Sequence, residues 1–159
     1  MKTLWAPWRI EYITGEKDKG CIFCDNPSEG NDEENLILFK GKYSFIIMNR
    51  YPYSNGHLMA VPYKHTRNMS ELDDNERLEL MNLTTKCIEI LSIMKPDGFN
   101  IGMNLGKAGG AGIDDHLHFH IVPRWNGDTN FMPLIGDVKI MPEYLHDTYK
   151  TLSEQIKNN

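Results

Sequence analysis

The sequence predicts an α+β fold with a mainly antiparallel sheet, one long helix and a C-terminal helix. Several short apolar segments end at Gly, Pro or Asn turn signals, which is typical of strands joined by hairpins. One long amphipathic segment interrupts these strands, and a shorter one lies near the C-terminus. With 159 residues, 40% of them hydrophobic, the chain has the size and composition of a single globular domain.

Turn signals separate five predicted strands. Gly41 and the segment 51–56, Tyr-Pro-Tyr-Ser-Asn-Gly, are turn sequences, and a glycine-rich run covers residues 106–112. The strands are expected at residues 36–39, 44–48, 57–61, 100–104 and 117–122. Within the single domain 1–159, residues 1–20 are aromatic and then charged, which indicates an arm laid on the domain. Residues 126–159 form a C-terminal extension that carries a helix.

The long helix is expected to begin just after Ser70, because the acidic residues that follow favour a helix N-terminus. It is predicted to run to about Met94, since Pro96 cannot continue a helix. The second helix is expected to begin near Pro142. The predicted apolar positions are Leu78, Met81, Ile88 and Leu91 in the long helix, and Tyr144, Leu145, Tyr149 and Leu152 in the second.

Composition and charge argue against several classes of binding partner for this protein. The net charge of -5 comes with no basic block, which argues against nucleic-acid binding. No apolar run is long enough to span a bilayer, and residues 1–9 have no signal-peptide core. The three cysteines are an odd number, so without a secretion signal a disulfide framework is not expected. The sequence therefore predicts a cytoplasmic protein without membrane or nucleic-acid partners.

Three of the six histidines alternate within the segment 116–120, His-Leu-His-Phe-His. Because side chains in a strand alternate between two faces, His116, His118 and His120 share one face, and the apolar residues between them share the other. An imidazole can be a nucleophile, a proton donor or a metal ligand near neutral pH. The alternative is a half-exposed polar strand that happens to be rich in histidine.

The segment 116–122, His-Leu-His-Phe-His-Ile-Val, resembles the signature of the histidine-triad superfamily of nucleotide hydrolases and transferases. The segments 48–50, 56–62, 64–65 and 98–106 follow that family's order of elements, so the resemblance covers roughly residues 21–125. The flanks 4–9 and 123–131 are most similar to a bacterial branch that resembles diadenosine tetraphosphate phosphorylases. The resemblance also implies a HIT-like fold and a homodimer paired through the long helix and a sheet edge.

In that superfamily the middle histidine attacks the α-phosphorus of a nucleotide and becomes covalently nucleotidylated. The resemblance assigns this role to His118, oriented by a backbone carbonyl that accepts its other ring proton. His120 is expected to donate a hydrogen bond to a non-bridging phosphate oxygen. Asn104 is expected near the scissile phosphate, and His57 is expected to be a supporting hydrogen-bond partner behind the nucleophile.

Further residues are candidates for substrate binding. The resemblance places Asn49 at a ribose hydroxyl and lets Ile47 and Met59 line the base pocket, although both are equally consistent with core positions. Trp125 is interpreted either as stacking on a base or walling off the second nucleotide, or as packing against Trp5 or Trp8. The glycines of segment 106–112, in particular Gly110 and Gly112, are interpreted as an anion nest of backbone N–H groups or as a flexible turn.

Cys21 and Cys24 have the two-residue spacing of a zinc knuckle. A pair of cysteines needs two more ligands for a tetrahedral ion, and the resemblance supplies His65 and His116. Many bacterial relatives, and the related galactose-1-phosphate uridylyltransferases, hold a structural Zn²⁺ in this way. The alternative is a reduced, metal-free thiol pair.

One position departs from the family pattern. Relatives that hydrolyse phosphoramidates carry a serine five residues before the nucleophile, where this chain has Ile113. This departure disfavours an aminoacyl- or lysyl-nucleotide substrate. On the resemblance, the favoured interpretation is an enzyme that cleaves dinucleoside polyphosphates, with an adenine dinucleotide as its partner, and the similarity to the phosphorylase branch favours phosphate as the acceptor. The alternatives are a dinucleoside polyphosphate or nucleoside phosphoramidate hydrolase and, from another class, a non-catalytic zinc-stabilised nucleotide-binding module.

Overall fold

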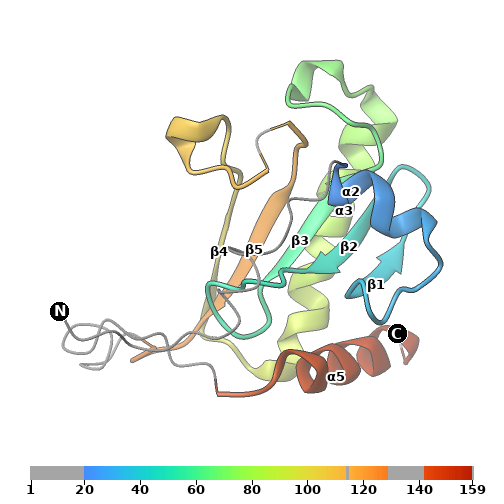
Figure 1. Ribbon diagram of the computed structural model, residues 1–159. Helices are drawn as coiled ribbons and strands as arrows, with labels where there is room; N and C mark the ends of the chain where they lie inside the picture. Colours follow the sequence, from blue (N-terminus) through green and yellow to red (C-terminus); the bar gives the residue numbers. More distant parts are fainter. Residues whose placement is uncertain (1–19, 114, 129–141, 159) are drawn as a thin grey trace, which may run out of the picture.

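The computed structural model describes residues 20–113, 115–128 and 142–158, and Figure 1 shows their arrangement. In this part of the chain, five antiparallel strands form one sheet in the order β1-β2-β3-β5-β4. The strands are β1 (Ile37–Lys40), β2 (Ser44–Met48), β3 (Leu58–Pro62), β4 (Gly98–Gly102) and β5 (Phe119–Arg124). The α-helices are α2 (Ile22–Asp25), α3 (Asp74–Leu91) and α5 (Leu145–Lys157), and 3-10 turns lie at η1 (Asn26–Ser28), η2 (Met69–Glu71), η3 (Ser92–Met94) and η4 (Lys107–Gly109).

The α+β class and the mainly antiparallel sheet are confirmed. Pairing of β2, β3, β5 and β4 places Ile47 opposite Met59, Met59 opposite His120, and His120 opposite Gly102. Directly opposite residues share a face of the sheet. The register therefore sets the third triad histidine in a row that runs from the buried core to the edge strand.

The strand that carries the triad begins later than expected. Regular pairing starts at Phe119 instead of residue 117, so His116 and His118 lie just before β5. The reason is a long-range bond, because the Leu117 N–H donates to the Thr66 carbonyl at 2.7 Å instead of joining the β3 ladder. Similarly, β4 ends at Gly102, which leaves Asn104 in the loop that follows it.

The long helix begins at Asp74, four residues after Ser70, and the expected start is therefore early. Asp73 is the N-cap, and its carboxylate accepts the Glu76 N–H at 2.9 Å. The Glu76 carboxylate in turn accepts the Asp73 N–H at 2.8 Å, which completes a capping box. Ser70 lies instead in the separate turn η2. The helical path ends with η3 at Met94, as predicted.

The face of α3 that packs on the sheet also differs from the expected one. Leu78 and Met81 are exposed by 62% and 50%, whereas Leu91 and the partly buried Ile88 face the core. At about 100° per residue, position 80 lies some 200° from position 78, so the helix has apolar side chains on two sides. The side that packs against β2, β3 and β5 is formed by Leu80, Leu83, Thr84, Cys87, Ile90 and Leu91.

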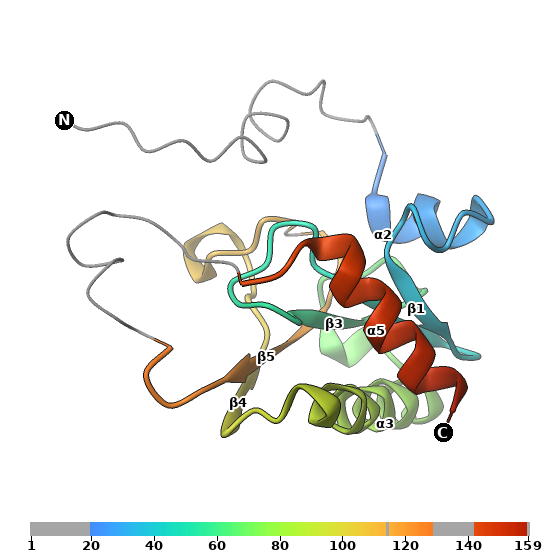
Figure 2. The ribbon, with the colours of Figure 1, turned by 90° about the horizontal axis from the view of Figure 1, so that it is seen from below.

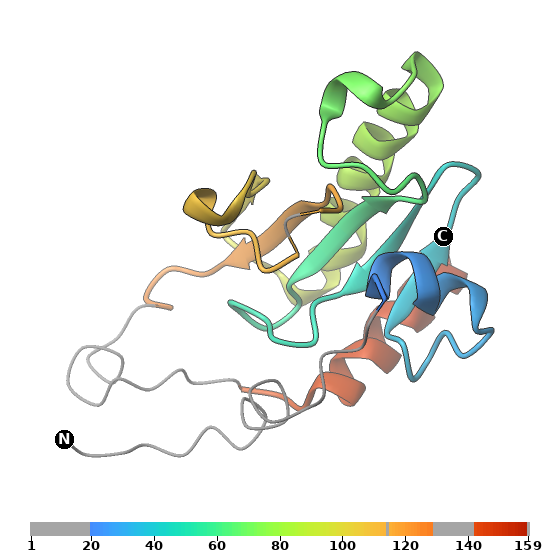
Figure 3. The ribbon, with the colours of Figure 1, turned by 45° about the horizontal axis from the view of Figure 1, so that its top comes forward.

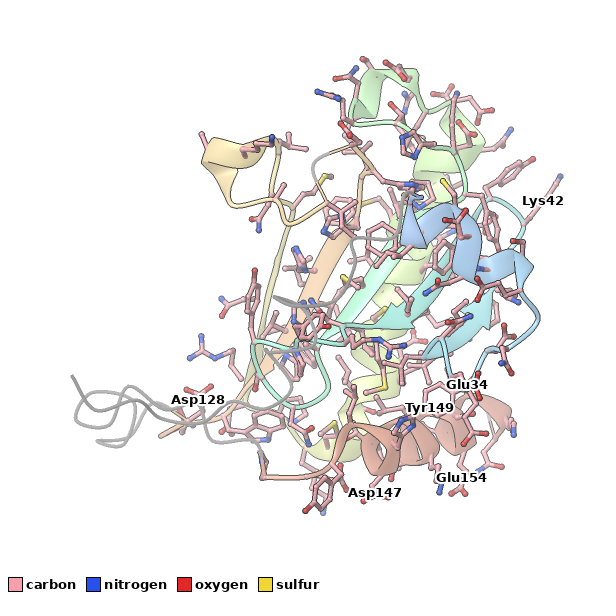
Figure 4. The ribbon with its side chains drawn as sticks, viewed as in Figure 1. Glu34, Lys42, Asp128, Asp147, Tyr149 and Glu154 are labelled. Atoms are coloured by element: carbon pink, nitrogen blue, oxygen red, sulfur yellow. The ribbon has the colours of Figure 1, made fainter. Side chains whose placement is uncertain are left out.

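Helices cover the sheet unequally. Figures 1 and 2 show α3 along one face and the short α2 on the opposite face. The C-terminal helix α5 packs against β1 and α3, and the hydroxyl of its Tyr149, labelled in Figure 4, donates to the Ile37 carbonyl at 3.0 Å. Leu152 is fully buried, but Tyr144 is 84% exposed at the helix N-cap and does not belong to the predicted apolar face. Within the described residues, no helix has the length and apolar composition needed to cross a membrane.

Candidate active site

The three triad histidines lie at and just before the start of β5, on the sheet face that carries α2. His116 and His118 are 1% and 5% exposed, and His120 is half-buried. The rings of His118 and His120 meet edge to face, with their centroids 4.7 Å apart. Phe23 of α2 covers His118 from the other side, at a centroid distance of 5.0 Å. The histidine-rich strand is thus a packed cluster of rings and not a solvated face.

A backbone carbonyl holds the His118 ring. Nδ1 of His118 lies 2.9 Å from the carbonyl oxygen of His116. A carbonyl only accepts, so Nδ1 carries the proton and Nε2 keeps its lone pair. Burial lowers the pKa of His118 below its ordinary value. The ring is therefore held neutral, in the tautomer whose Nε2 is the nucleophilic nitrogen.

The tautomer of His120 is set by a relay of two hydrogen bonds. The Tyr53 N–H donates to Nδ1 of His57 at 3.0 Å, so the proton of the His57 ring is on Nε2. Nε2 of His57 lies 2.9 Å from Nδ1 of His120 and donates its proton to it. The ring proton of His120 is therefore on its Nε2. Burial, with the neighbouring His118, lowers the pKa of His120 to about 4. His57, which is fully buried, thus supports His120 and not the predicted nucleophile.

A cavity of about 270 Å³ opens beside His120. Two predicted site residues, His120 and Asn104, line it, and Tyr53 and Asn100 are lining residues that the sequence analysis did not select. The Tyr53 ring stacks on His57 with centroids 4.9 Å apart. The complete lining is Tyr53, Asn100, Ile101, Gly102, Met103, Asn104, His120 and Val122.

Several other predicted substrate contacts do not line this cavity. Ile47 and Met59 are 3% and 6% exposed and belong to the core cluster, in the same cross-strand row as His120. The Asn49 side-chain oxygen accepts the Tyr51 N–H at 2.8 Å. Trp125 lies beyond β5, where its indole N–H donates to the Met94 carbonyl at 3.3 Å. Trp5 and Trp8, the packing partners of Trp125 in the alternative interpretation, lie outside the described residues.

The glycine-rich loop runs from β4 to the residues before β5 (Figure 3). The N–H groups of Gly109, Gly110 and Ala111 donate to carbonyls of Gly106 and Lys107 within the loop. These three groups are therefore already satisfied and do not form the predicted anion nest. Gly110 has a φ of 86°, and its carbonyl accepts the Asn104 amide N–H at 3.3 Å, so the loop positions Asn104. Gly112 is exposed.

Arg124 is held by neighbours at the far end of β5. Its guanidinium donates to both carboxylate oxygens of Asp128, at 2.5 and 2.8 Å, and to the Asn100 side-chain oxygen at 2.8 Å; Figure 4 labels Asp128. Asn100 lines the cavity, so Arg124 reaches its border. Its positive charge is paired with Asp128.

The four side chains predicted as metal ligands lie together. The candidate atoms of Cys21, Cys24, His65 and His116 are all within 4.8 Å of one another. Sulfur-to-Nδ1 distances are 3.3 Å for Cys21–His116, 3.3 Å for Cys24–His65 and 3.6 Å for Cys24–His116. Tetrahedral Zn²⁺ with ordinary Zn–S and Zn–N bonds separates its sulfur and nitrogen ligands by about 3.5 Å. The donor set and its spacing therefore fit a zinc ion.

The protonation of the cluster also suits a cation. Nε2 of His116 lies 2.7 Å from the Pro62 carbonyl, so this nitrogen holds the proton and Nδ1 faces the sulfurs with its lone pair. Partial burial and the adjacent Cys21 thiol raise the pKa of Cys24 to about 11. A metal ion reverses such a shift, because it stabilises both thiolates.

Three residues that build the site were not predicted from the sequence: Phe23, Tyr53 and Asn100. Phe23 lies between the two cysteines, and an aromatic residue inside a metal-binding turn indicates packing on a neighbouring group. Tyr53 lies four residues before His57 in a turn sequence, where its backbone N–H can reach the His57 ring. For Asn100 the sequence contains no comparable signal, because its place in the cavity depends on the pairing of β4 with β5.

Comparison with known proteins is consistent with this geometry. The family model of the HIT domain matches residues 31–127. The chain belongs to the HIT family. It is 38% identical to AP-4-A phosphorylase of Mycobacterium tuberculosis, over 98% of this chain and 84% of that protein. It is 27% identical to adenosine 5'-monophosphoramidase hnt1 of Schizosaccharomyces pombe, over 86% of this chain and 98% of that protein.

Solved structures of HIT proteins have the same fold. The hypothetical histidine triad nucleotide-binding protein ST2152 from Sulfolobus tokodaii is 29% identical, with a TM-score of 0.64 over 87% of this chain and 93% of that one. A Zn-bound histidine triad family protein from Mycobacterium smegmatis is 22% identical, with a TM-score of 0.70 over 87% of this chain and 94% of that one. The predicted HIT-like fold is thereby confirmed.

Proposed function

We propose that this protein is a nucleotide-processing enzyme that cleaves dinucleoside polyphosphates through a covalent nucleotidyl-His118 intermediate. The observation that carries the proposal is the hydrogen bond from Nδ1 of His118 to the His116 carbonyl, 2.9 Å long. It supports a neutral imidazole with an unprotonated Nε2, which is the form that attacks phosphorus. The 38% identity to an AP-4-A phosphorylase supports an adenine dinucleotide as the substrate.

In the proposed first step, Nε2 of His118 attacks the α-phosphorus. The bond from that phosphorus to the bridging oxygen breaks, and the remaining nucleoside polyphosphate leaves with its electron pair. His120 has its proton on Nε2, beside the cavity, and would donate a hydrogen bond to a non-bridging oxygen of the reacting phosphate. The Asn104 amide, held by the Gly110 carbonyl, lies on the same cavity and would bind the phosphate chain.

In the proposed second step, an oxygen of inorganic phosphate attacks the phosphorus of nucleotidyl-His118 and forms a new P–O bond. The P–N bond breaks, its electron pair returns to Nε2 of His118, and a nucleoside diphosphate is released. The similarity to the mycobacterial phosphorylase supports phosphate, whereas the similarity to a phosphoramidase supports water as the acceptor. Ile113 stands where phosphoramidate hydrolases are expected to carry a serine that hydrogen-bonds the leaving group, which disfavours a phosphoramidate as the substrate. A dinucleoside polyphosphate or phosphoramidate hydrolase is therefore the second candidate, and a non-catalytic nucleotide-binding module is the third.

We also propose that Cys21, Cys24, His65 and His116 hold a structural Zn²⁺. When bound, the ion would cross-link α2, the residues after β3 and the segment before β5 without entering the reaction. Four protein ligands would fill its coordination sphere, which is the pattern of structural zinc.

Product analysis tests the acceptor. With diadenosine tetraphosphate and millimolar phosphate, we expect ADP and ATP as the products, and a higher rate than without phosphate. AMP and ATP as the main products in phosphate would identify a hydrolase instead. Binding without any turnover would favour the non-catalytic module. Chromatography of the nucleotides after a single incubation distinguishes the three outcomes.

A further inference from the structure

A buried polar contact joins the C-terminal helix to the turn that carries His57. Thr148 of α5 is 1% exposed, and its hydroxyl lies 3.0 Å from the side-chain oxygen of Asn55, which is itself only 6% exposed. The two residues are 93 positions apart in the chain. Thr148 also lies outside the segment 31–127 that matches the HIT domain. The contact is therefore supplied by the extension and not by the matched domain.

The contact belongs to a small hydrogen-bonded cluster. The Thr148 hydroxyl has one proton and three acceptor oxygens in reach: the Glu143 carboxylate at 2.5 Å, the Asn55 side chain at 3.0 Å and the Tyr144 carbonyl at 3.3 Å. The carboxylate of Glu143, just before α5, also accepts the Asn55 amide N–H at 3.4 Å and so links the two side chains. Both polar atoms of the Asn55 side chain thus face the N-terminal end of α5: the amide N–H donates to Glu143, and the oxygen shares the Thr148 proton with Glu143. A buried amide that loses its partner costs free energy, so the cluster ties the position of Asn55 to that of the helix.

Asn55 lies in the turn that sets the position of His57. The His57 N–H donates to the Ser54 carbonyl at 3.1 Å, which closes a turn with Asn55 and Gly56 at its centre. Gly56 has a φ of 73°, and a Cβ there would come within 2.8 Å of the Met94 sulfur, so the turn needs glycine. Tyr53, two residues before Asn55, donates its N–H to the His57 ring at 3.0 Å.

These contacts form a continuous route from α5 to the cavity. Thr148 holds Asn55, the turn of Asn55 holds the His57 ring, and Nε2 of His57 lies 2.9 Å from Nδ1 of His120. His120 lines the cavity in which the phosphate chain is proposed to bind. A displaced turn would tilt the donor nitrogen of His120 away from the reacting phosphate.

We propose that Thr148 is a positioning residue, which acts through Asn55 and His57 to aim the Nε2–H of His120. This inference deepens the proposed function and rests on it. The hydroxyl is the group that matters, since the isosteric Val keeps the shape and burial of Thr148 but removes the proton that the Asn55 oxygen and the Glu143 carboxylate share. His120 is proposed to act on the transition state, so the loss is expected in kcat more than in KM.

The test compares Thr148→Val with Thr148→Ser, which keeps the hydroxyl, and with Thr151→Val on the exposed side of the same helix. For cleavage of diadenosine tetraphosphate, we expect Thr148→Val to lower kcat about tenfold with KM within twofold of wild type. Thr148→Ser and Thr151→Val should stay within twofold in both constants. In an Asn55→Ala background, Thr148→Val should lower kcat no further, because the two residues act in series.

A second readout does not depend on turnover. NMR spectra of histidine-labelled protein report the ring proton shared by His57 and His120. We expect this signal in wild type, Thr148→Ser and Thr151→Val, and a shifted or broadened signal in Thr148→Val. If wild type does not cleave the dinucleotide, the proposed function fails while this spectrum still tests the route from α5. An unchanged spectrum, or unchanged kcat in Thr148→Val, would overturn the positioning role.

Discussion

His116 makes contacts through three different parts of the residue, its two ring nitrogens and its backbone carbonyl. Its Nδ1 faces the sulfurs of Cys21 and Cys24, and its backbone carbonyl accepts the ring proton of His118. The carbonyl of Pro62 fixes the orientation of its ring through Nε2. A single residue thus connects the candidate metal cluster with the proposed nucleophile. Positioning of His118 therefore depends on how well this one peptide unit is held.

Replacement of the proposed nucleophile gives the most direct test at the residue scale. We expect His118→Ala to lower kcat by about a thousandfold or more, because no other described group offers an unprotonated nitrogen in its place. Affinity for a non-cleavable dinucleotide should change little. His146→Ala, at an exposed position of α5, serves as the control. Turnover within tenfold of wild type would rule out covalent catalysis by His118.

Stability should fall in mild acid because His120 is buried in its neutral form. Its pKa is about 4 in the folded protein and 6.5 in an ordinary environment. A base with a lowered pKa contributes stability above the unfolded value, and this contribution is lost as the pH falls from 6.5 to 4. The ring is only partly buried, so solvent screening reduces the expected loss to about 1 kcal/mol.

Urea unfolding at pH 7.5 and pH 5 measures this effect. The difference in unfolding free energy between the two pH values should be smaller in His120→Asn than in wild type. His146→Asn, whose side chain is exposed, should keep the wild-type difference. An equal pH dependence in His120→Asn and wild type would contradict the assignment of the titration to His120.

At the scale of elements, the candidate zinc cluster joins three segments: α2, the residues after β3 and the residues before β5. It adds to the ring contact of Phe23 with His118 and the hydrogen bond from Leu117 to Thr66. Cys21→Ser should lose the metal and lower the free energy of unfolding by about 3 kcal/mol. This is roughly the stabilisation given by a ligand whose free concentration is a few hundred times its Kd. For a chain of this size the melting temperature should fall by roughly 6 to 12 °C. Metal analysis by mass spectrometry should find one zinc per wild-type chain.

Cys87→Ala is the matched control for the metal. Cys87 is the remaining cysteine, fully buried in α3 and not part of the cluster. This variant should lose some stability from the missing packing but keep its zinc. Well-folded wild-type protein without bound metal, or a Cys87→Ala variant without it, would contradict the four-ligand site.

Local sequence signals predicted the elements where one signal dominates. Pro96 predicts the end of the α3 path, and alternation predicts the triad strand. The predicted start of α3 was wrong because Ser70 and Asp73 are both favourable N-cap residues. The capping box between Asp73 and Glu76 selects Asp73. The predicted buried face of α3 was partly wrong because the helix has apolar residues on two sides, and only one of these sides packs on the sheet.

In the site, too, some features could be predicted from the sequence and others could not. The family resemblance predicted that the four candidate metal ligands lie together, and their ligand atoms are within 4.8 Å of one another in the structure. The partner of His57 could not be predicted, because it depends on the register that sets Met59 opposite His120. The cavity residue Asn100 and the contact between Asn55 and Thr148 also depend on pairing between segments far apart in the chain. Such long-range contacts have no local signal.

At the scale of the whole molecule, the two edges of the sheet differ. Helix α5 packs along β1 and donates a hydrogen bond from Tyr149 to the Ile37 carbonyl. The other edge strand, β4, pairs only with β5 among the described strands. Ile101 in β4 is 45% exposed, and Leu105 after it is 59% exposed. An edge that no described strand pairs with, and that has exposed apolar side chains, favours pairing with a second chain.

We therefore expect a symmetric homodimer that pairs through β4, with the exposed Leu78 and Met81 of α3 as further candidates for the interface. Sedimentation at micromolar concentration should give about twice the chain mass of 18.4 kDa. Ile101→Lys should shift the protein toward the monomer, because an isologous contact places the new charge at the interface twice. Tyr144→Ser, which changes an 84% exposed side chain at the start of α5, should leave the mass unchanged. A wild-type protein that sediments as a monomer, or an Ile101→Lys variant that stays fully dimeric, would argue against pairing through this edge.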